Sequence, residues 1–250
     1  MADWRIIWGE CVAVMGEMEA GLARLVFADP PYNIGVDYGD HHDDRMEPAD
    51  YLDWCERWIR AAARLLTPDG SLWVLVNWEW VWDIKPLAER AGLHLRQPIV
   101  WRETFGVNCT RKFGRCSRPL LWLVKDPGRF VFNADAIRVR SKRQELGDKR
   151  ANPRGKIPDD VWTFPRVAGT HRERIAGFPT QLPVKLLNRV VACASEPGDL
   201  VIDPFSGSGT TGRACIGIGR RFVGIELSEG FAERSRRLLA SVTPQLAGWA

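Results

Sequence analysis

The sequence has few of the residues that build metal sites or disulfide frameworks. Its 250 residues include 6 cysteines and 4 histidines, and the cysteines lack the paired two-residue spacing of zinc ligands. We therefore expect no metal site and no disulfide framework, and we expect the thiols to be buried or idle. His41 and His42 stand beside several carboxylates. Adjacent positions in a loop seldom converge on one ion, so a solvated loop over residues 36–50 is the better interpretation.

Long apolar runs are also missing. No stretch approaches the ~20 apolar residues that cross a bilayer, and residues 1–5 lack the basic-then-apolar layout of a secretion signal. We expect a cytoplasmic protein that contacts no membrane. Hydrophobic residues make up 45% of the chain. This content is enough for one sizeable core in a single α/β domain with an insertion, and it requires no second domain.

Charge is unevenly distributed along the chain, although the formal net charge is only +4. Residues 1–110 hold 10 lysines and arginines against 18 acidic residues, whereas residues 111–174 hold 17 against 7. A basic middle segment that follows an acidic start indicates contact with a polyanion. A solvated basic loop without a partner is the alternative from the charge pattern alone.

The first informative motif is Asp29-Pro30-Pro31-Tyr32, which follows the apolar run of residues 25–28. The run predicts a short buried strand, and the two prolines prevent that strand from continuing. The motif therefore delivers a carboxylate and an aromatic ring at the carboxyl end of a strand, where ligands bind in open α/β sheets. For this motif alone, an ordinary strand-ending turn is the alternative.

A second motif lies near the other end of the sequence. A hydrophobic strand at residues 200–203 leads into the glycine loop of residues 205–209 and then into a helix from Thr210. Glycines let the backbone approach a ligand closely. The next strand, residues 222–225, ends at Glu226, where a carboxylate can accept hydrogen bonds from both hydroxyls of a ribose. These features predict a nucleoside site.

Taken together, the motifs resemble those of the DNA amino-methyltransferases that use S-adenosylmethionine. The resemblance rests on Asp-Pro-Pro-Tyr at residues 29–32, Phe-Pro-Thr-Gln-Leu-Pro at residues 178–183 and Asp-Pro-Phe-x-Gly-x-Gly at residues 203–209. Their order is similar to the beta arrangement of that family, in which the catalytic motif comes first, a target-recognition segment follows and the cofactor loop comes last. The resemblance covers nearly the whole chain.

This resemblance implies an α/β, Rossmann-like methyltransferase fold with a central, mostly parallel twisted sheet, a circularly permuted motif order and a small irregular insertion. It assigns residues 1–125 to the catalytic half of the core, residues 126–177 to a basic target-recognition insertion and linker, and residues 178–250 to the cofactor-binding half of the same core. Apolar patterns add expected strands at residues 5–8, 71–77, 95–101 and 120–124 and helices at residues 11–18, 49–66, 78–91 and 181–194.

The resemblance also implies roles for individual residues. Asp29 and the Pro30 carbonyl accept hydrogen bonds from an exocyclic amine of the target base, Pro31 belongs to the rigid turn, and Tyr32 stacks on the flipped-out base. Glu226 takes the ribose hydroxyls. The residues implied to bind S-adenosylmethionine are Glu10, Thr180, Gln181, Asp203, Phe205, Gly207, Gly209, Thr210 and Glu226.

The basic middle segment is implied to contact double-stranded DNA. The candidate contacts are Arg138, Arg140, Lys142, Arg143, Lys149, Arg150, Arg154 and Lys156. Relatives with this motif order often pair, so a homodimer is open, as is a restriction endonuclease counterpart. They also often carry a glutamate shortly before the strand at residues 120–124, where this chain has Arg115-Cys116-Ser117-Arg118.

The expected reaction is methyl transfer to adenine N6, because in the resembling family an aspartate at the first motif position accompanies mostly adenine enzymes. Cytosine N4 methylation is the nearest alternative. Remoter alternatives are an inactive DNA-binding module and a nicotinamide-dependent dehydrogenase, since Gly207-x-Gly209-x-x-Gly212 also fits the dinucleotide pattern. Only one strand and one helix are expected after that loop, which argues against a dehydrogenase.

Overall fold

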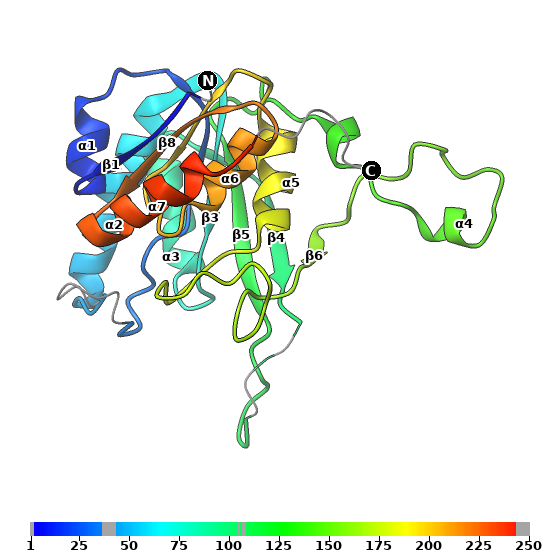
Figure 1. Cartoon of the computed structure of the whole chain (residues 1–250), viewed down its shortest axis with the longest axis horizontal. Coiled ribbons are helices and arrows are strands. Elements are labelled where there is room, and N and C mark those ends of the chain that lie inside the picture. The colour runs from blue at the N-terminus through cyan, green and yellow to red at the C-terminus, as the bar shows by residue number, and fades with distance from the viewer. Residues whose placement is uncertain (1–2, 37–43, 105, 107–108, 244–250) are drawn as a thin grey trace.

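Figure 1 shows the computed structural model of the chain. It describes residues 3–36, 44–104, 106 and 109–243, so His41 and His42 lie outside the described residues. The strands are β1 (Trp4–Trp8), β2 (Ala23–Ala28), β3 (Leu66–Leu75), β4 (His94–Arg102), β5 (Ser117–Val124), β6 (Val161–Thr163), β7 (Leu200–Asp203) and β8 (Arg221–Glu226). The helices are α1 (Cys11–Glu17), α2 (Pro48–Leu65), α3 (Val81–Arg90), the 3-10 turn η1 (Ala134–Ile137), α4 (Lys142–Glu145), α5 (Val184–Ala194), α6 (Thr210–Gly217) and α7 (Glu229–Ala240).

The strands of the described residues form an eight-stranded sheet in the order β1-β8-β7-β2-β3-β5-β4-β6. Neighbouring strands are parallel except where β5 pairs with β3 and with β4. Strands from the two ends of the chain interleave, because β7 pairs with β2 and β8 pairs with β1. The predicted Rossmann-like, mostly parallel fold is confirmed. Its topology gathers the carboxyl ends of β1, β2, β7 and β8 at one edge of the sheet.

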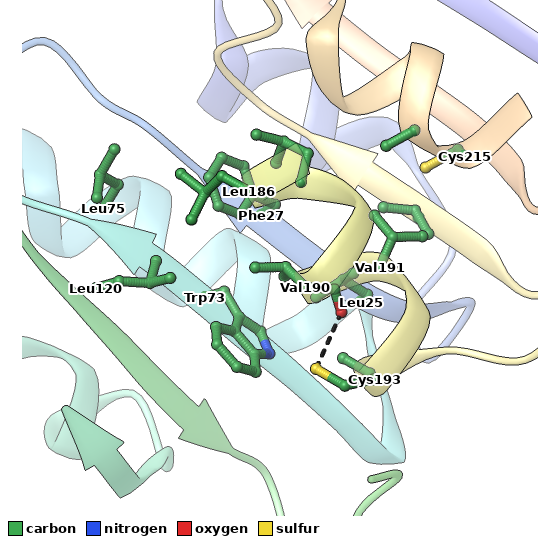
Figure 2. Close-up of a cluster of buried hydrophobic side chains, with 14 of the residues drawn as sticks. Leu25, Phe27, Trp73, Leu75, Leu120, Leu186, Val190, Val191, Cys193 and Cys215 are labelled. Carbon is green, nitrogen blue, oxygen red and sulfur yellow. Dashed lines mark hydrogen bonds between the residues drawn. The ribbon is translucent and has the colours of Figure 1, made fainter. Parts of the chain in front are cut away.

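Apolar layers cover both faces of this sheet. Leu25 and Phe27 of β2 pack in a cluster with α5, α6 and α7, and Figure 2 shows them beside Val190 of α5. Val26 and Ala28 point the other way, into a cluster with α1, α2 and α3. A strand buried on both faces needs apolar residues at every position, which explains the uninterrupted run before Asp29.

Gly212 sets how closely α6 approaches the sheet. A Cβ atom at this position would lie 2.7 Å from the Phe222 ring of β8 and 2.8 Å from Leu239 of α7. A larger residue would therefore push α6 away from β8. The third glycine of the loop motif serves helix–sheet packing and not ligand contact.

Three predicted elements differ in detail. Helix α5 begins at Val184 and not at residue 181, because Pro183 precedes its first turn. Strand β3, expected to begin at residue 71, begins at Leu66, where it already pairs with β2. Residues 161–163, expected to be irregular, form β6 beside β4. Figure 1 shows the segment with α4 projecting sideways, beyond the β6 edge of the sheet.

Candidate functional site

A cavity of about 520 Å³ opens at the edge where β1, β2, β7 and β8 end. This volume lies within the range of roughly 300–1,000 Å³ that is typical of small-molecule sites. The predicted site residues that line it are Glu10, Asp29, Pro30, Pro31, Tyr32, Thr180, Asp203, Phe205, Gly207, Thr210 and Glu226. The structure thus brings together two motifs that are far apart in the sequence.

Gln181 and Gly209 are not among the lining residues of this cavity. The side chain of Gln181 turns toward a neighbouring loop, where it accepts a hydrogen bond from the Ile175 N–H at 2.9 Å and donates to the Glu173 carbonyl at 2.6 Å. Gly209 has a φ of 72° and precedes the first residue of α6. Both residues therefore support segments of the cavity wall without lining the cavity themselves.

The turn after β2 is held by hydrogen bonds from three other segments. The Tyr51 hydroxyl of α2 donates to the Pro31 carbonyl at 2.8 Å, and the Trp80 indole donates to the Tyr32 carbonyl at 2.8 Å. Asp44, which is buried, accepts from the Tyr32 N–H at 3.2 Å and from two further backbone N–H groups at 2.6 and 2.8 Å. The turn therefore presents Asp29 to the cavity on a rigid support.

Asp29 is half-buried, with a hydroxyl group and a guanidinium group beside it. Tyr32 donates its hydroxyl hydrogen to Asp29 Oδ1, and Arg118 of β5 donates from Nη1 to the Tyr32 hydroxyl oxygen at 3.2 Å. Burial raises the pKa of Asp29, whereas the charge of Arg118 and the hydrogen bond from Tyr32 lower it. The carboxylate therefore depends on these two neighbours for its ionised form.

Glu226 and the glycine loop form the opposite wall of the cavity. Glu226 accepts hydrogen bonds from the Gly207 N–H at 2.8 Å and from the Ser228 N–H at 3.0 Å. Gly207 has a φ of 47°, in the left-handed region that favours glycine. The carboxylate thus fixes the loop after β7 against the loop after β8, and its remaining lone pairs can accept bonds from a ligand.

Asp203 lies between these two walls and is buried. It accepts hydrogen bonds from the Thr211 hydroxyl at 2.5 Å and from the Phe205 N–H at 2.9 Å. Its pKa is raised to about 7, chiefly by burial and further by the nearby charges of Asp29 and Glu226, although the hydrogen bonds from Thr211 and Phe205 lower it. A cation bound beside Asp203 would relieve this cost by favouring the carboxylate.

Glu10 and an aromatic wall complete the site. Glu10 caps α1 by accepting from the Val12 and Ala13 N–H groups at 3.0 and 2.9 Å. Burial raises its pKa, but these bonds outweigh burial and leave the pKa lower than usual. The Phe205 ring lies 5.6 Å from the Trp54 ring, centroid to centroid. The wall offers an apolar surface to a planar ligand.

Sequence reasoning missed several residues that line the cavity. Among them are Asp44, Tyr51, Trp54, Arg57, Arg118 and Phe231. They come from elements outside the two motifs, so no local pattern marks them. For Arg118 the only signal was that it stands where the resembling family often has a glutamate.

The cations predicted to contact DNA fall into two groups. Many pair within the insertion itself: Arg138 and Arg154 with Asp135, Arg150 with Asp148, and Lys156 with Asp159. The exposed remainder consists of Arg140, Lys142, Arg143 and Lys149. A second basic surface lies in the hairpin between β4 and β5 (described residues 109–116), where Arg111 and Lys112 directly precede a fully exposed Phe113. Figure 1 shows the described part of this hairpin extending beyond the ends of β4 and β5.

Comparison with known proteins identifies the family. The profile described as "DNA methylase" (N6_N4_Mtase) matches residues 23–237. The chain belongs to this DNA methylase family. It is 36% identical over 243 residues to the DNA adenine methyltransferase YhdJ of Escherichia coli, a match that covers 94% of this chain and 82% of YhdJ. It is 32% identical over 240 residues to the type II methyltransferase M.HpaI of Haemophilus parainfluenzae, covering 96% of this chain and 75% of M.HpaI.

Solved DNA methylase structures share the fold. The crystal structure of the M1.HpyAVI–SAM complex superposes with a TM-score of 0.68 at 22% identity, covering 94% of this chain and 98% of that chain. The cytosine-N4-specific PvuII DNA methyltransferase superposes with a TM-score of 0.75 at 15% identity, covering 99% of this chain and 89% of that chain. The family predicted from the motifs is confirmed, and the dehydrogenase alternative is wrong.

The described residues hold neither a membrane-spanning helix nor a cluster of metal ligands. No helix in this part of the DNA methylase is long and apolar enough to cross a membrane. Within the same residues, no group of three or more His, Cys, Asp or Glu side chains is arranged to hold a metal ion.

Proposed function

We propose that this DNA methylase transfers the methyl group of S-adenosylmethionine to the exocyclic N6 amine of a flipped-out adenine in double-stranded DNA. The proposal rests on one observation. Asp29 and the contact between Glu226 and Gly207 both line the same cavity. The name of the relative YhdJ, a DNA adenine methyltransferase, supports adenine as the base. Because its substrate is DNA, we also propose a cytoplasmic location; a homodimer and a restriction endonuclease counterpart stay predictions.

The residues of the cavity fit the cofactor. S-adenosylmethionine, when bound, supplies a methyl group on a positively charged sulfur. Glu226 has acceptor capacity for the ribose hydroxyls, and Asp203 lies buried where an ammonium group would favour its ionised form. Phe205 and Trp54 supply an apolar wall for adenine. Gly207 and Thr180 line the same cavity for the methionine part, whereas Gln181 supports the wall through its backbone contacts.

Asp29 makes the target amine a better nucleophile. The lone pair of an exocyclic amine is delocalised into the ring, so the amine is a poor nucleophile. Asp29 and the Pro30 carbonyl accept hydrogen bonds from its two hydrogens and favour a pyramidal nitrogen with a free lone pair. The negative charge of Asp29 and the partial negative charge of the Pro30 carbonyl oxygen face positive charge that develops only in the transition state. The rigid turn aligns the amine for in-line attack.

The target base reaches Asp29 only after leaving the duplex. In the structure the Tyr32 hydroxyl is bonded to Asp29 Oδ1, so an amine that takes this same oxygen as its acceptor displaces the hydroxyl. Once released, the Tyr32 ring is free to turn and stack on the base, as its place in the motif predicts. The internal hydrogen bond thus gives the half-buried carboxylate a partner until the base arrives.

We expect two basic surfaces to contact DNA, namely the segment with α4 and the hairpin between β4 and β5. Arg140, Lys142 and Arg143 lie exposed in the segment with α4, which we call the lobe. Reversing the charge of these three residues should flatten the slope of log affinity against log salt by up to about 3, because each lost phosphate contact removes about 0.9. Reversal of Arg111 and Lys112 on the hairpin should flatten it by up to about 2. Fluorescence anisotropy with labelled duplexes at several salt concentrations measures both slopes.

The control for this prediction is cofactor binding, which should be unchanged in both variants because neither basic surface lines the cavity. A lobe variant with the wild-type slope would show that DNA docks only at the hairpin. The reverse result would assign docking to the lobe.

The proposed reaction is tested by its product. The enzyme is incubated with unmethylated duplex DNA and labelled S-adenosylmethionine, and the DNA is digested to nucleosides and analysed by mass spectrometry. N6-methyladenine is the expected product. N4-methylcytosine as the sole product would overturn the base assignment, and an absence of any methylated nucleoside would overturn the proposed activity.

A further inference from the structure

Arg118, the second residue of β5, links the catalytic turn to a buried acid behind it. Its Nη1 lies 3.2 Å from the Tyr32 hydroxyl oxygen, and its guanidinium carbon lies 5.3 Å from the centroid of the Tyr32 ring. Its Nε lies 3.0 Å from Glu103, which is 5% exposed and follows β4. The guanidinium carbon also lies 5.7 Å from the Trp101 ring. These contacts leave the guanidinium little freedom to turn away from Asp29.

We infer that Arg118 is a positioning residue for methyl transfer, which holds the Tyr32 hydroxyl at Asp29 and supplies the positive charge that the catalytic carboxylate faces. The inference rests on the proposed function, because it assigns to Asp29 the role of accepting the target amine. Neither of the two motifs contains Arg118. Its role follows from the pairing of β5 with β3 and β4, which brings the start of β5 to the carboxyl edge of the sheet.

The cavity around Asp29 is mainly acidic. The titratable and charged side chains that line it are Glu10, Cys11, Asp29, Tyr32, Asp44, Tyr51, Arg57, Arg118, Asp203 and Glu226. Of the two arginines, Arg57 acts on Glu10, whereas Arg118 acts on Asp29. Burial by itself lowers the pKa of Arg118, but Tyr32, Asp29 and Glu103 together raise it above its ordinary value. Arg118 therefore stays charged throughout the working pH range and opposes protonation of Asp29.

Arg118 also gives Tyr32 a second anchor. Arg118 donates to the hydroxyl oxygen, whereas Tyr32 donates its own hydrogen to Asp29. The bond from Arg118 can therefore persist after the target amine has displaced the hydroxyl from Asp29. The Tyr32 ring then turns toward the base while Arg118 still holds its hydroxyl group, which limits the orientations open to the ring.

The test is the pH dependence of single-turnover methyl transfer, measured with saturating S-adenosylmethionine and DNA so that cofactor binding does not limit the rate. Removing the charge in Arg118→Met should raise the pKa of Asp29, and activity should then appear only at higher pH. We expect the acid limb of the pH–rate profile to move to higher pH by at least about one unit, because a neighbouring arginine lowers the pKa of an aspartate by about that much or more. Arg118→Lys keeps the charge but loses the forked contact, so its acid limb should stay near that of the wild type while the rate falls at every pH.

Arg96→Met is the matched control. Arg96 of β4 also lies over aromatic rings, 5.9 Å from Trp122 and 5.4 Å from Phe130, but does not line the cavity. Its pH profile should equal that of the wild type. If Arg118→Met fails to fold by thermal melting, Arg118→Gln takes its place as the neutral variant.

An acid limb in the neutral Arg118 variant that coincides with that of the wild type, with the rate lowered equally at every pH, would overturn the inference. Failure of the wild type to methylate DNA at any pH would instead count against the proposed function. The two failures are therefore distinguishable.

Discussion

Asp29→Ala is expected to lower methyl transfer by about 10³-fold or more, while S-adenosylmethionine binds with nearly unchanged affinity. The size of the loss follows from removing a charged group that faces charge developing in the transition state. Cofactor affinity should survive because the side chain of Asp29 bonds to Tyr32 and not to the Glu226–Gly207 wall. Single-turnover transfer of tritiated methyl groups and isothermal titration with the cofactor measure the two quantities.

Asp53→Ala is the control for this prediction, because Asp53 is an exposed aspartate on α2. It should transfer methyl groups at the wild-type rate. Asp29→Asn refines the test: it keeps the shape of the side chain but loses the charge, so it should remain severely impaired. Wild-type transfer by Asp29→Ala would remove Asp29 from the reaction, and a loss of cofactor binding as large as the loss of rate would mean that the variant damages the whole cavity.

The parts of the site that the sequence predicted are those built from local patterns. The apolar run before Asp29 marks a buried strand, and the prolines mark its end, so the position of the carboxylate follows from neighbouring residues alone. The same holds for Glu226, which follows a second apolar strand. Both strands run parallel, and parallel strands place their carboxyl ends at one edge. The convergence of Asp29 and Glu226 was therefore predictable once the resemblance supplied the strand order.

The site residues that the sequence did not predict are those that tertiary packing brings to the cavity. Asp44 and Tyr51 reach the catalytic turn from outside it, and Arg118 reaches it only because an antiparallel strand starts at that edge. None of these residues stands in a pattern that distinguishes it from other surface or core residues. Strand β6 was missed because its three residues are too few to show a period of two.

Gln181 shows a different limit of prediction from the sequence. Its neighbour Thr180 lines the cavity, but the Gln181 amide has both a donor and an acceptor and satisfies a backbone carbonyl and a backbone N–H of the 173–175 loop. A motif places the segment correctly, yet it does not show toward which partner each side chain turns. That choice depends on polar backbone groups that are distant in the sequence.

Glu226→Ala is expected to weaken S-adenosylmethionine binding by about 100-fold. Two hydrogen bonds from the ribose to a charged acceptor are lost, each at about 1.5 kcal/mol, and 1.4 kcal/mol corresponds to about tenfold in affinity. The variant also loses the bonds that Glu226 accepts from the Gly207 and Ser228 N–H groups, which loosens the glycine loop. Isothermal titration with the cofactor measures the change.

Glu226→Gln separates charge from geometry, because its amide oxygen can still accept one of the two backbone bonds while the negative charge is gone. Its affinity should lie between those of the wild type and Glu226→Ala, about tenfold below the wild type. Glu229→Ala, an exposed carboxylate at the start of α7, is the matched control and should bind normally. At saturating cofactor the Glu226 variants should recover most of the transfer rate, since Asp29 is intact. Normal affinity in Glu226→Ala would mean that the ribose lies elsewhere in the cavity, whereas a rate that stays low at saturation would place Glu226 in the alignment of the reacting groups.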